Sequence, residues 1–149
     1  MAINRDYIGH VYPPTDPYEV SRVKIAEFAT AIGDANPVYR DAAVAQAAGH
    51  PDVIAPPTFA IVISMASSGV AIADPDLGLN YAMVVHGEQR FEYSRPIMAG
   101  DVVTAQATIS DIRGVGSLTM MTTRTEIRTV AGEHVCTALS TLVERGGAA

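Results

Sequence analysis

Residues 58–73, near the middle of the chain, are almost continuously apolar and read TFAIVISMASSGVAIA. A helix that is apolar on every face must be buried in protein or in lipid. Sixteen residues give about 24 Å of helix, whereas a membrane span needs about 20 apolar residues. Asp74-Pro75 ends the run, because proline disfavours a helical residue before it. The pattern therefore predicts one long helix over 58–73, surrounded by protein.

Two shorter helices are predicted ahead of this segment. Asp16-Pro17-Tyr18-Glu19 combines an N-cap residue, a proline and an acidic residue in the order typical of a helix start. We expect a helix over 17–32, ended by Gly33, with one face formed by Ser21, Ile25, Phe28 and Ile32. A second helix over 42–48, capped by Asp41 and ended by Gly49, follows.

The period of the pattern changes to two after Leu79, which predicts strands. Breaks at glycine-containing segments divide this part of the chain into four candidates, residues 83–93, 102–112, 117–128 and 134–144. Residues 7–12, ended by Pro13, are a candidate for a short first strand. The short connections predict an antiparallel meander.

One strand, then helices, then four strands is an α+β order in which a single sheet can curl around one buried helix. That is the arrangement of the hot-dog fold, with about five antiparallel strands around the helix. We expect residues 1–149 to form one domain, with frayed ends at 1–6 and 146–149.

The composition of the chain argues against one class of partner and favours one cellular compartment. The net charge of −6 argues against a nucleic-acid partner. The chain has one cysteine, Cys136, which excludes an internal disulfide and favours a cytoplasmic location. Cys136 lies in a segment that alternates like a strand, which favours a thiol packed in the core over a nucleophile. We expect no membrane association and see no signal-type segment before Tyr7.

Two short motifs carry a family resemblance. Asp34-Ala35-Asn36-Pro37-Val38-Tyr39 resembles the Asp-x-Asn-Pro-x-His signature of the MaoC-like (R)-specific hydratases and dehydratases. His86-Gly87-Glu88-Gln89 and the later Arg95-Pro96 and Gly100-Asp101 resemble that superfamily's first hot-dog half. In two-domain members this half has lost its catalytic residues and shapes the acyl channel.

The resemblance implies a reaction that adds or removes water across an acyl thioester, between trans-2-enoyl and (R)-3-hydroxyacyl forms. Such chemistry needs an acid and a base, and a donor that holds the thioester oxygen as negative charge develops on it. In the family, the Asp and His of the signature handle protons, and a backbone amide of a His-Gly pair polarises the carbonyl. The resemblance implies no cofactor, since coenzyme A or acyl carrier protein carries the substrate.

The sequence departs from the family at the histidine of the signature and at the His-Gly pair. Tyr39 stands where the signature has histidine, and a phenol of pKa about 10 is a poor base at neutral pH. Pro57 stands near the position of the glycine, and proline has no N–H to donate. The Thr58 amide is the nearest substitute donor. Asp34 and Asn36 are then remnants of a degenerate site.

We therefore expect a non-catalytic, acyl-chain-binding subunit, similar to the accessory subunits of heterodimeric mycolic-acid-type dehydratases. We expect either a homodimer or a heterodimer with a catalytic MaoC-like subunit. In the heterodimer, the catalytic subunit would supply the histidine and the oxyanion donor that this chain lacks. The candidate substrate-binding residues are Pro56, Pro57, Thr58, Phe59, His86 and Gly87.

Other interpretations of these residues remain open. Asp34 and Asn36 also suit a simple turn, and His86 suits a strand core. His134 and Cys136 supply only two zinc ligands, which is too few for a metal site. Arg90 and Arg95 are solvated charges or thioester-phosphate contacts.

Three other functions use the same fold. The chain could be a non-enzymatic acyl-thioester binder, or a self-sufficient homodimeric dehydratase in which His86 is the base. A thioesterase would need a water-activating carboxylate on the central helix, and residues 58–73 contain no ionisable side chain.

Overall fold

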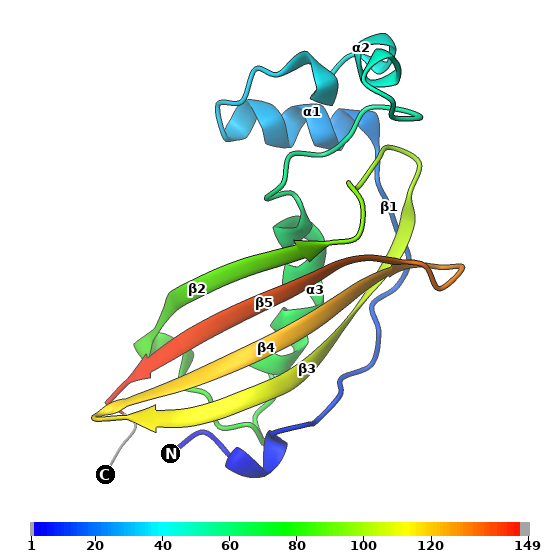
Figure 1. Cartoon of the computed structure of the whole chain (residues 1–149). Coiled ribbons are helices and arrows are strands. Elements are labelled where there is room, and N and C mark those ends of the chain that lie inside the picture. Colours follow the sequence, from blue (N-terminus) through cyan, green and yellow to red (C-terminus); the bar gives the residue numbers. More distant parts are fainter. Residues whose placement is uncertain (1, 147–149) are drawn as a thin grey trace.

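The computed structural model describes residues 2–146, in which a five-stranded antiparallel sheet curls around the central helix (Figure 1). The helix, α3, spans Ala60–Ile72. The strands are β1 (Tyr18–Glu19), β2 (Val84–Tyr93), β3 (Val102–Val115), β4 (Leu118–Thr129) and β5 (His134–Arg145). The α+β hot-dog architecture predicted from the sequence is confirmed.

The strand order in the sheet is β1-β3-β4-β5-β2. Strands β3, β4 and β5 form the predicted meander, and Gly116 and Gly132 occupy the positive-φ positions of its two turns. The meander prediction is wrong for β2, which pairs with β5 and not with β3. The connection over 94–101 is longer than a hairpin loop and contains Pro96, so β2 and β3 need not be neighbours in the sheet.

The predicted helix start at residue 17 is wrong. Tyr18 and Glu19 form β1 against Val103 and Val102, so the chain is still extended there. Helix α1 spans Arg22–Ala31, and its N-cap is Ser21, whose Oγ accepts a hydrogen bond from the Lys24 amide at 3.1 Å. Pairing with the sheet therefore overrides the local start signal at Asp16.

The predicted first strand over 7–12 is also replaced by another structure. A 3-10 helix, η1, spans Arg5–Tyr7, and the following segment runs beside β3 with a single bridge from Val11 to Thr108. The first described residues contact the rest of the chain, since Ile3 is buried and the Asn4 amide donates to the Leu77 carbonyl at 2.8 Å. Residues 1 and 147–149 lie outside the described range.

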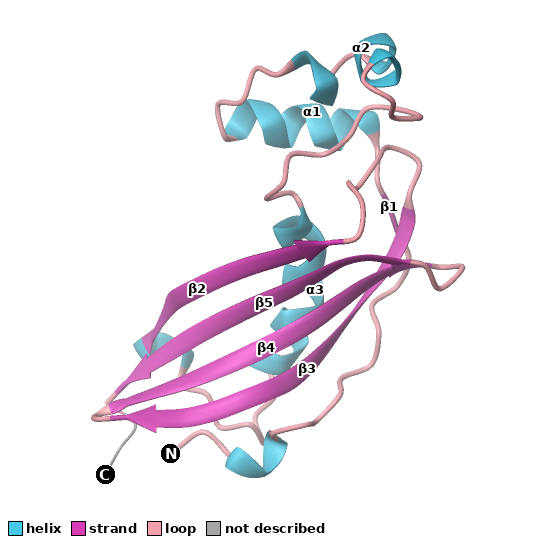
Figure 2. Ribbon diagram, in the orientation of Figure 1, coloured by secondary structure: helices cyan, strands magenta, loops and turns pink. Residues whose placement is uncertain are grey.

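The other local predictions before α3 are confirmed. Asn36 caps the 3-10 turn η2 (Pro37–Tyr39), and Asp41 caps helix α2 (Ala42–Ala47) through a 2.8 Å bond from the Ala43 amide. Helices α1 and α2 lie together at one end of the molecule, beyond the start of α3 (Figure 2).

The expected complete burial of α3 is wrong for this chain alone. Ile63, Ser67 and Ala71 are buried under the sheet, whereas the Met65 and Val70 side chains are 63% and 49% exposed. One curved sheet covers only one side of a helix (Figure 1), so an apolar strip of α3 faces outward. Helix α3 has thirteen residues. Within the described residues, no helix is long and apolar enough to span a membrane.

Candidate functional site

The Asp34–Asn36 segment is a turn built from its own side chains. Asp34 Oδ1 accepts a hydrogen bond from the Asn36 amide at 3.0 Å, and Asn36 Oδ1 accepts one from the Val38 amide at 3.1 Å. Arg40 Nη1 donates to the Asp34 carbonyl at 2.8 Å and closes the turn. One side-chain oxygen of Asp34 and one of Asn36 therefore bind the backbone of the turn that leads to Tyr39.

Tyr39 is 8% exposed and packs into the core cluster beneath α1 and α2. Burial, and then the negative charge of Asp34, raise the pKa of its phenol above the ordinary value. The side chain therefore stays protonated at neutral pH. Tyr39 lines a pocket of about 400 Å³ whose other walls are Ile54, Ala55, Pro57, Tyr93, Ser94, Arg95 and Pro96.

The start of α3 is fixed by its two prolines. The Pro57 carbonyl accepts a 2.6 Å hydrogen bond from the Tyr93 hydroxyl, and the Pro56 carbonyl accepts one from the Phe59 amide at 2.8 Å. The Thr58 amide has no acceptor within residues 2–146, so it is the first unpaired donor at this end of the helix. Phe59 is fully buried against Phe28, with ring centroids 5.4 Å apart, and is a core residue.

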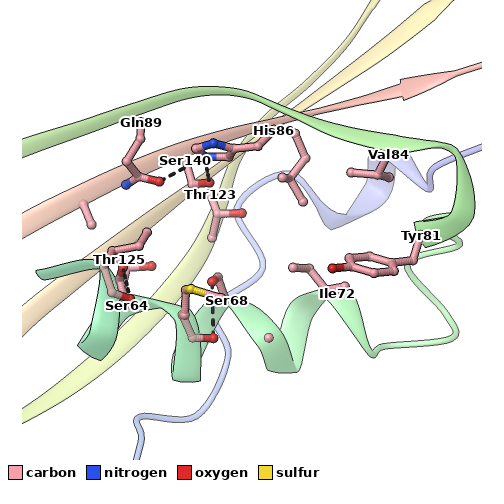
Figure 3. A pocket seen from close by; sticks show the side chains of 15 residues that line it. Ser64, Ser68, Ile72, Tyr81, Val84, His86, Gln89, Thr123, Thr125 and Ser140 are labelled. Carbon is pink, nitrogen blue, oxygen red and sulfur yellow. Dashed lines mark hydrogen bonds between the residues drawn. The ribbon is translucent and has the colours of Figure 1, made fainter. Parts of the chain in front are cut away.

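A second and larger pocket, of about 580 Å³, lies between α3 and the β2–β5 side of the sheet (Figure 3). It forms because α3 packs mainly over β3 and β4, which leaves space beside β2. Most of its wall is apolar. The lining residues are Ile61, Ser64, Met65, Ser68, Gly69, Ile72, Tyr81, Val84, His86, Gln89, Thr123, Thr125, Ala138, Ser140 and Leu142.

A β-bulge at Gly87 shapes this pocket. The register of β2 against β5 shifts between His86 and Glu88, so one extra residue enters the strand. Residues three apart in a regular strand face opposite sides, yet His86 and Gln89 both line the pocket because of the bulge. A Cβ at Gly87 would lie 2.8 Å from Val143 Cγ2, which accounts for the glycine.

Three polar side chains meet on this wall of the pocket. His86 Nε2 lies 3.2 Å from Gln89 Oε1 and 3.3 Å from Ser140 Oγ (Figure 3). Gln89 Nε2 is buried and has no hydrogen-bond partner within the described residues. We refer to His86, Gln89 and Ser140 as the polar cluster.

The structure thus divides the candidate residues between two places. Tyr39 and Pro57 line the smaller pocket, whereas His86 lines the larger one and Gly87 shapes it. Sequence reasoning missed Gln89 and Ser140 as lining residues. A glycine inside a strand pattern, at position 87, was the available signal for a bulge.

Arg95 holds the β2–β3 connection in place through its hydrogen bonds. Its guanidinium bonds Asp101 at 2.8 and 3.0 Å and Glu133 at 2.7 Å, which raises the pKa of Arg95. The other candidate cation, Arg90, pairs with Glu92 at 2.8 Å. These ion pairs favour a structural role for Arg95 over a contact with a thioester phosphate.

His134 and Cys136 have separate surroundings. Both ring nitrogens of His134 contact hydroxyls, Ser94 Oγ at 2.6 Å and Thr137 Oγ1 at 2.8 Å. The Cys136 thiol is buried in the core, and burial raises its pKa to about 11. Within residues 2–146, no group of three or more His, Cys, Asp or Glu side chains is placed to hold a metal ion.

A sheet curled around one helix is the hot-dog arrangement, and this chain shares it with MaoC-like dehydratases of known structure. Residues in 93% of the chain superpose on a MaoC-like dehydratase with a TM-score of 0.86 at 34% identity, covering 42% of that longer chain. The truncated HadBC complex, a (3R)-hydroxyacyl-ACP dehydratase from Mycobacterium tuberculosis, matches with a TM-score of 0.82 at 26% identity, covering 93% of this chain and 97% of that one.

The chain belongs to the FAS1-like dehydratase family, whose model, described as the dehydratase domain region, matches residues 6–138. Its relatives of similar length are UPF0336 proteins. One from Thermobifida fusca is 60% identical over 99% of this chain and 97% of its own length. Another, from Streptomyces coelicolor, is 52% identical over 97% of both chains.

Proposed function

We propose that this chain is the acyl-chain-binding, non-catalytic subunit of a (3R)-hydroxyacyl-thioester dehydratase or trans-2-enoyl-thioester hydratase in fatty-acid or related acyl metabolism. The observation that carries the proposal is Tyr39, a protonated, buried phenol at the position where the family signature has a histidine. A general base contributes about 10²–10⁴ in rate. A phenol whose pKa is raised above 10 does not supply it at neutral pH.

The larger pocket supports the acyl-binding half of the proposal. Its volume of about 580 Å³ falls within the usual range for small-molecule sites, about 300–1,000 Å³. Ile61, Met65, Ile72 and Leu142 give it long apolar walls that suit a hydrocarbon chain. The substrate is expected on coenzyme A or acyl carrier protein, with no further cofactor.

The exposed apolar surfaces support a partner subunit. Strand β2 is an edge of the sheet, with unpaired backbone groups on one side. On this strand Val85 is 43% exposed, and Met65 and Val70 on α3 are exposed as well. The similar solved structures include two complexes from Mycobacterium tuberculosis, HadBC and ChsH1-ChsH2. A catalytic MaoC-like chain covering these surfaces would supply the histidine and the oxyanion donor.

The test is affinity purification of the tagged chain from its native host, followed by assay of the isolated complex. We expect a partner that carries an intact Asp-x-Asn-Pro-x-His signature and a complex that hydrates a long-chain trans-2-enoyl thioester. Replacing the partner's signature histidine should abolish turnover, whereas Tyr39→Phe in this chain should not. A homodimer whose activity depends on His86 would contradict the proposal.

A further inference from the structure

The larger pocket has a polar part and an apolar end. The hydroxyl, carboxamide and imidazole side chains of its wall extend from the end at Ser64 as far as His86, whereas Ile72, Val84 and Tyr81 form the other end (Figure 3). We propose, on the basis of the acyl-binding function above, that the hydrocarbon tail of the bound chain ends against Tyr81. Tyr81 then limits the length of the acyl chain, and a buried carboxyl group holds Tyr81 in place.

The distribution of polar groups gives the direction of the bound chain. Along β5, Leu142 pairs with His86, and Glu144, the next residue on the same face, pairs with Val84. A thioester and its C3 oxygen are stabilised by hydrogen-bonding groups, whereas a hydrocarbon tail is stabilised by apolar contacts. The polar end at Ser64 is also the end nearer the start of α3. The head of the acyl chain therefore lies on the Ser64 side and its tail on the Val84 side.

Tyr81 closes the apolar end of the pocket. Its side chain points back from the 3-10 turn η3 (Tyr81–Met83) toward the pocket, between Ile72 on α3 and Val84 on β2 (Figure 3). The residue is 68% exposed, so its ring separates the pocket from the outside of the chain. A tail that is longer than the pocket meets this ring, and its additional methylene groups stay in water and add no affinity.

The buried carboxyl group of Glu144 fixes the turn that carries Tyr81. Asn80 Oδ1 accepts a hydrogen bond from the Ala82 amide at 3.2 Å and so caps η3. The Asn80 amide donates to Glu144 Oε2 at 2.6 Å, and Glu144 is only 2% exposed. Removal of this acceptor would leave the Asn80 amide without its partner. Glu144 is therefore a positioning residue, which ties the turn to β5 at the end of the pocket.

The experiment is titration calorimetry of the purified full-length chain with even-numbered saturated acyl-coenzyme A thioesters, from octanoyl to eicosanoyl. Each methylene group that enters the pocket should tighten binding about fourfold. We expect the dissociation constant of the wild type to fall with chain length and to level off where the terminal methyl group reaches Tyr81. In Tyr81→Ala the fall should continue, so that the first thioester beyond the wild-type limit binds about four- to sixteenfold more tightly than the last one within it.

Met65→Ala is the control inside the pocket, because Met65 follows Ser64 on α3 and lies away from the apolar end. It should weaken the binding of all the thioesters by a similar factor and leave the length limit unchanged. Glu144→Gln keeps an oxygen that accepts a hydrogen bond and should keep the wild-type limit. Glu144→Leu removes the acceptor and should move the limit to longer chains, as Tyr81→Ala does.

The outcomes separate this inference from the proposed function. If the wild type binds the thioesters but shows no length limit, or if Tyr81→Ala keeps the wild-type limit, the inference is overturned and acyl binding stands. If Tyr81→Ala moves the limit and Glu144→Leu does not, the positioning role of Glu144 is overturned. If the wild type binds none of the thioesters, acyl binding fails and the inference fails with it. Tyr81→Ala decides the main point even if Glu144→Leu does not fold, because Tyr81 is an exposed residue.

Discussion

The backbone of Gly87 lies against the side chain of Val143 on the neighbouring strand β5. A methyl group at position 87 would come within 2.8 Å of Val143 Cγ2 and 3.4 Å of the Thr141 carbonyl oxygen. This close approach is part of the bulge that turns His86 and Gln89 toward the same pocket. The glycine thus links the packing of two strands to the composition of the pocket wall.

Gly87→Ala should therefore lower the free energy of unfolding by about 1–3 kcal/mol, the usual cost of overpacking. Urea denaturation followed by circular dichroism measures the change. Val143→Ala made in the same chain should recover part of the loss, since it removes the atom that the new methyl group meets.

Gly69→Ala is the matched control for this prediction. Gly69 lies inside α3 at an ordinary negative φ, and a Cβ there would meet nothing within 4 Å. Alanine has a higher helix propensity than glycine, so the variant should gain up to about 1 kcal/mol. Equal destabilisation by both substitutions would contradict the account of the bulge.

Tyr39→His should not by itself create a hydratase. The variant restores the imidazole of the family signature, but Pro57 still has no N–H to hold the thioester oxygen. One oxyanion donor contributes about 10²–10³ in rate. Absorbance of a trans-2-enoyl thioester should therefore decay at the uncatalysed rate with the purified variant. Turnover comparable to that of an active complex would show that the Thr58 amide already serves as the donor.

The Arg95 network makes stability depend on pH at the acidic end. Hydrogen bonds from Arg95, and then its charge, lower the pKa of Glu133 below the ordinary value of 4.5. A carboxyl group whose pKa is lowered in the folded state stabilises that state above its unfolded pKa. This stabilisation is lost as the pH falls through the folded pKa. Glu133→Gln should flatten the fall in melting temperature below about pH 4.5, and a curve parallel to the wild type would contradict the assignment.

Arg95→Lys should destabilise the chain at neutral pH. Lysine keeps the charge but cannot form the paired bonds to Asp101, whose side chain is only 10% exposed. Hydrogen bonds between charged groups are worth about 1.5–3 kcal/mol, so a loss of about 2 kcal/mol is expected. Arg90→Lys is the control, because Arg90 is 65% exposed and its ion pair with Glu92 lies at the surface. That variant should change stability by less than about 0.5 kcal/mol.

The thiol of Cys136 should be unreactive in the folded chain. It is fully buried, and burial raises its pKa to about 11, so little thiolate forms at pH 8. A colorimetric thiol reagent should react within seconds in guanidinium chloride and only at the rate of unfolding in its absence. Immediate reaction of the native protein would place Cys136 outside the core.

The parts of the fold that could be predicted from the sequence are those fixed by local signals. The β3–β5 meander follows from a period of two broken by Gly116 and Gly132. The pairing of β2 with β5, and the extended β1 in place of a helix turn, depend on contacts between residues more than forty positions apart. Periodicity and cap residues do not contain that information.

The same limit applies to the candidate site. The replacement of histidine by Tyr39 can be read in the sequence, and the structure adds that burial keeps its phenol protonated. The place of Phe59 after Pro57 and Thr58 predicts a pocket residue, but the start of α3 turns its side chain into the core against Phe28. Gln89 was hidden because strand alternation places it opposite His86, and only the bulge at Gly87 brings the two together.

The most direct test of the central claim is the hydration rate of a long-chain trans-2-enoyl-coenzyme A by the purified chain alone, compared with the same chain bound to its catalytic partner. The account predicts no turnover above background for the chain alone and full activity for the complex. Robust turnover by the isolated chain would contradict it, because a buried phenol at position 39 and a proline at position 57 would then have to support the chemistry.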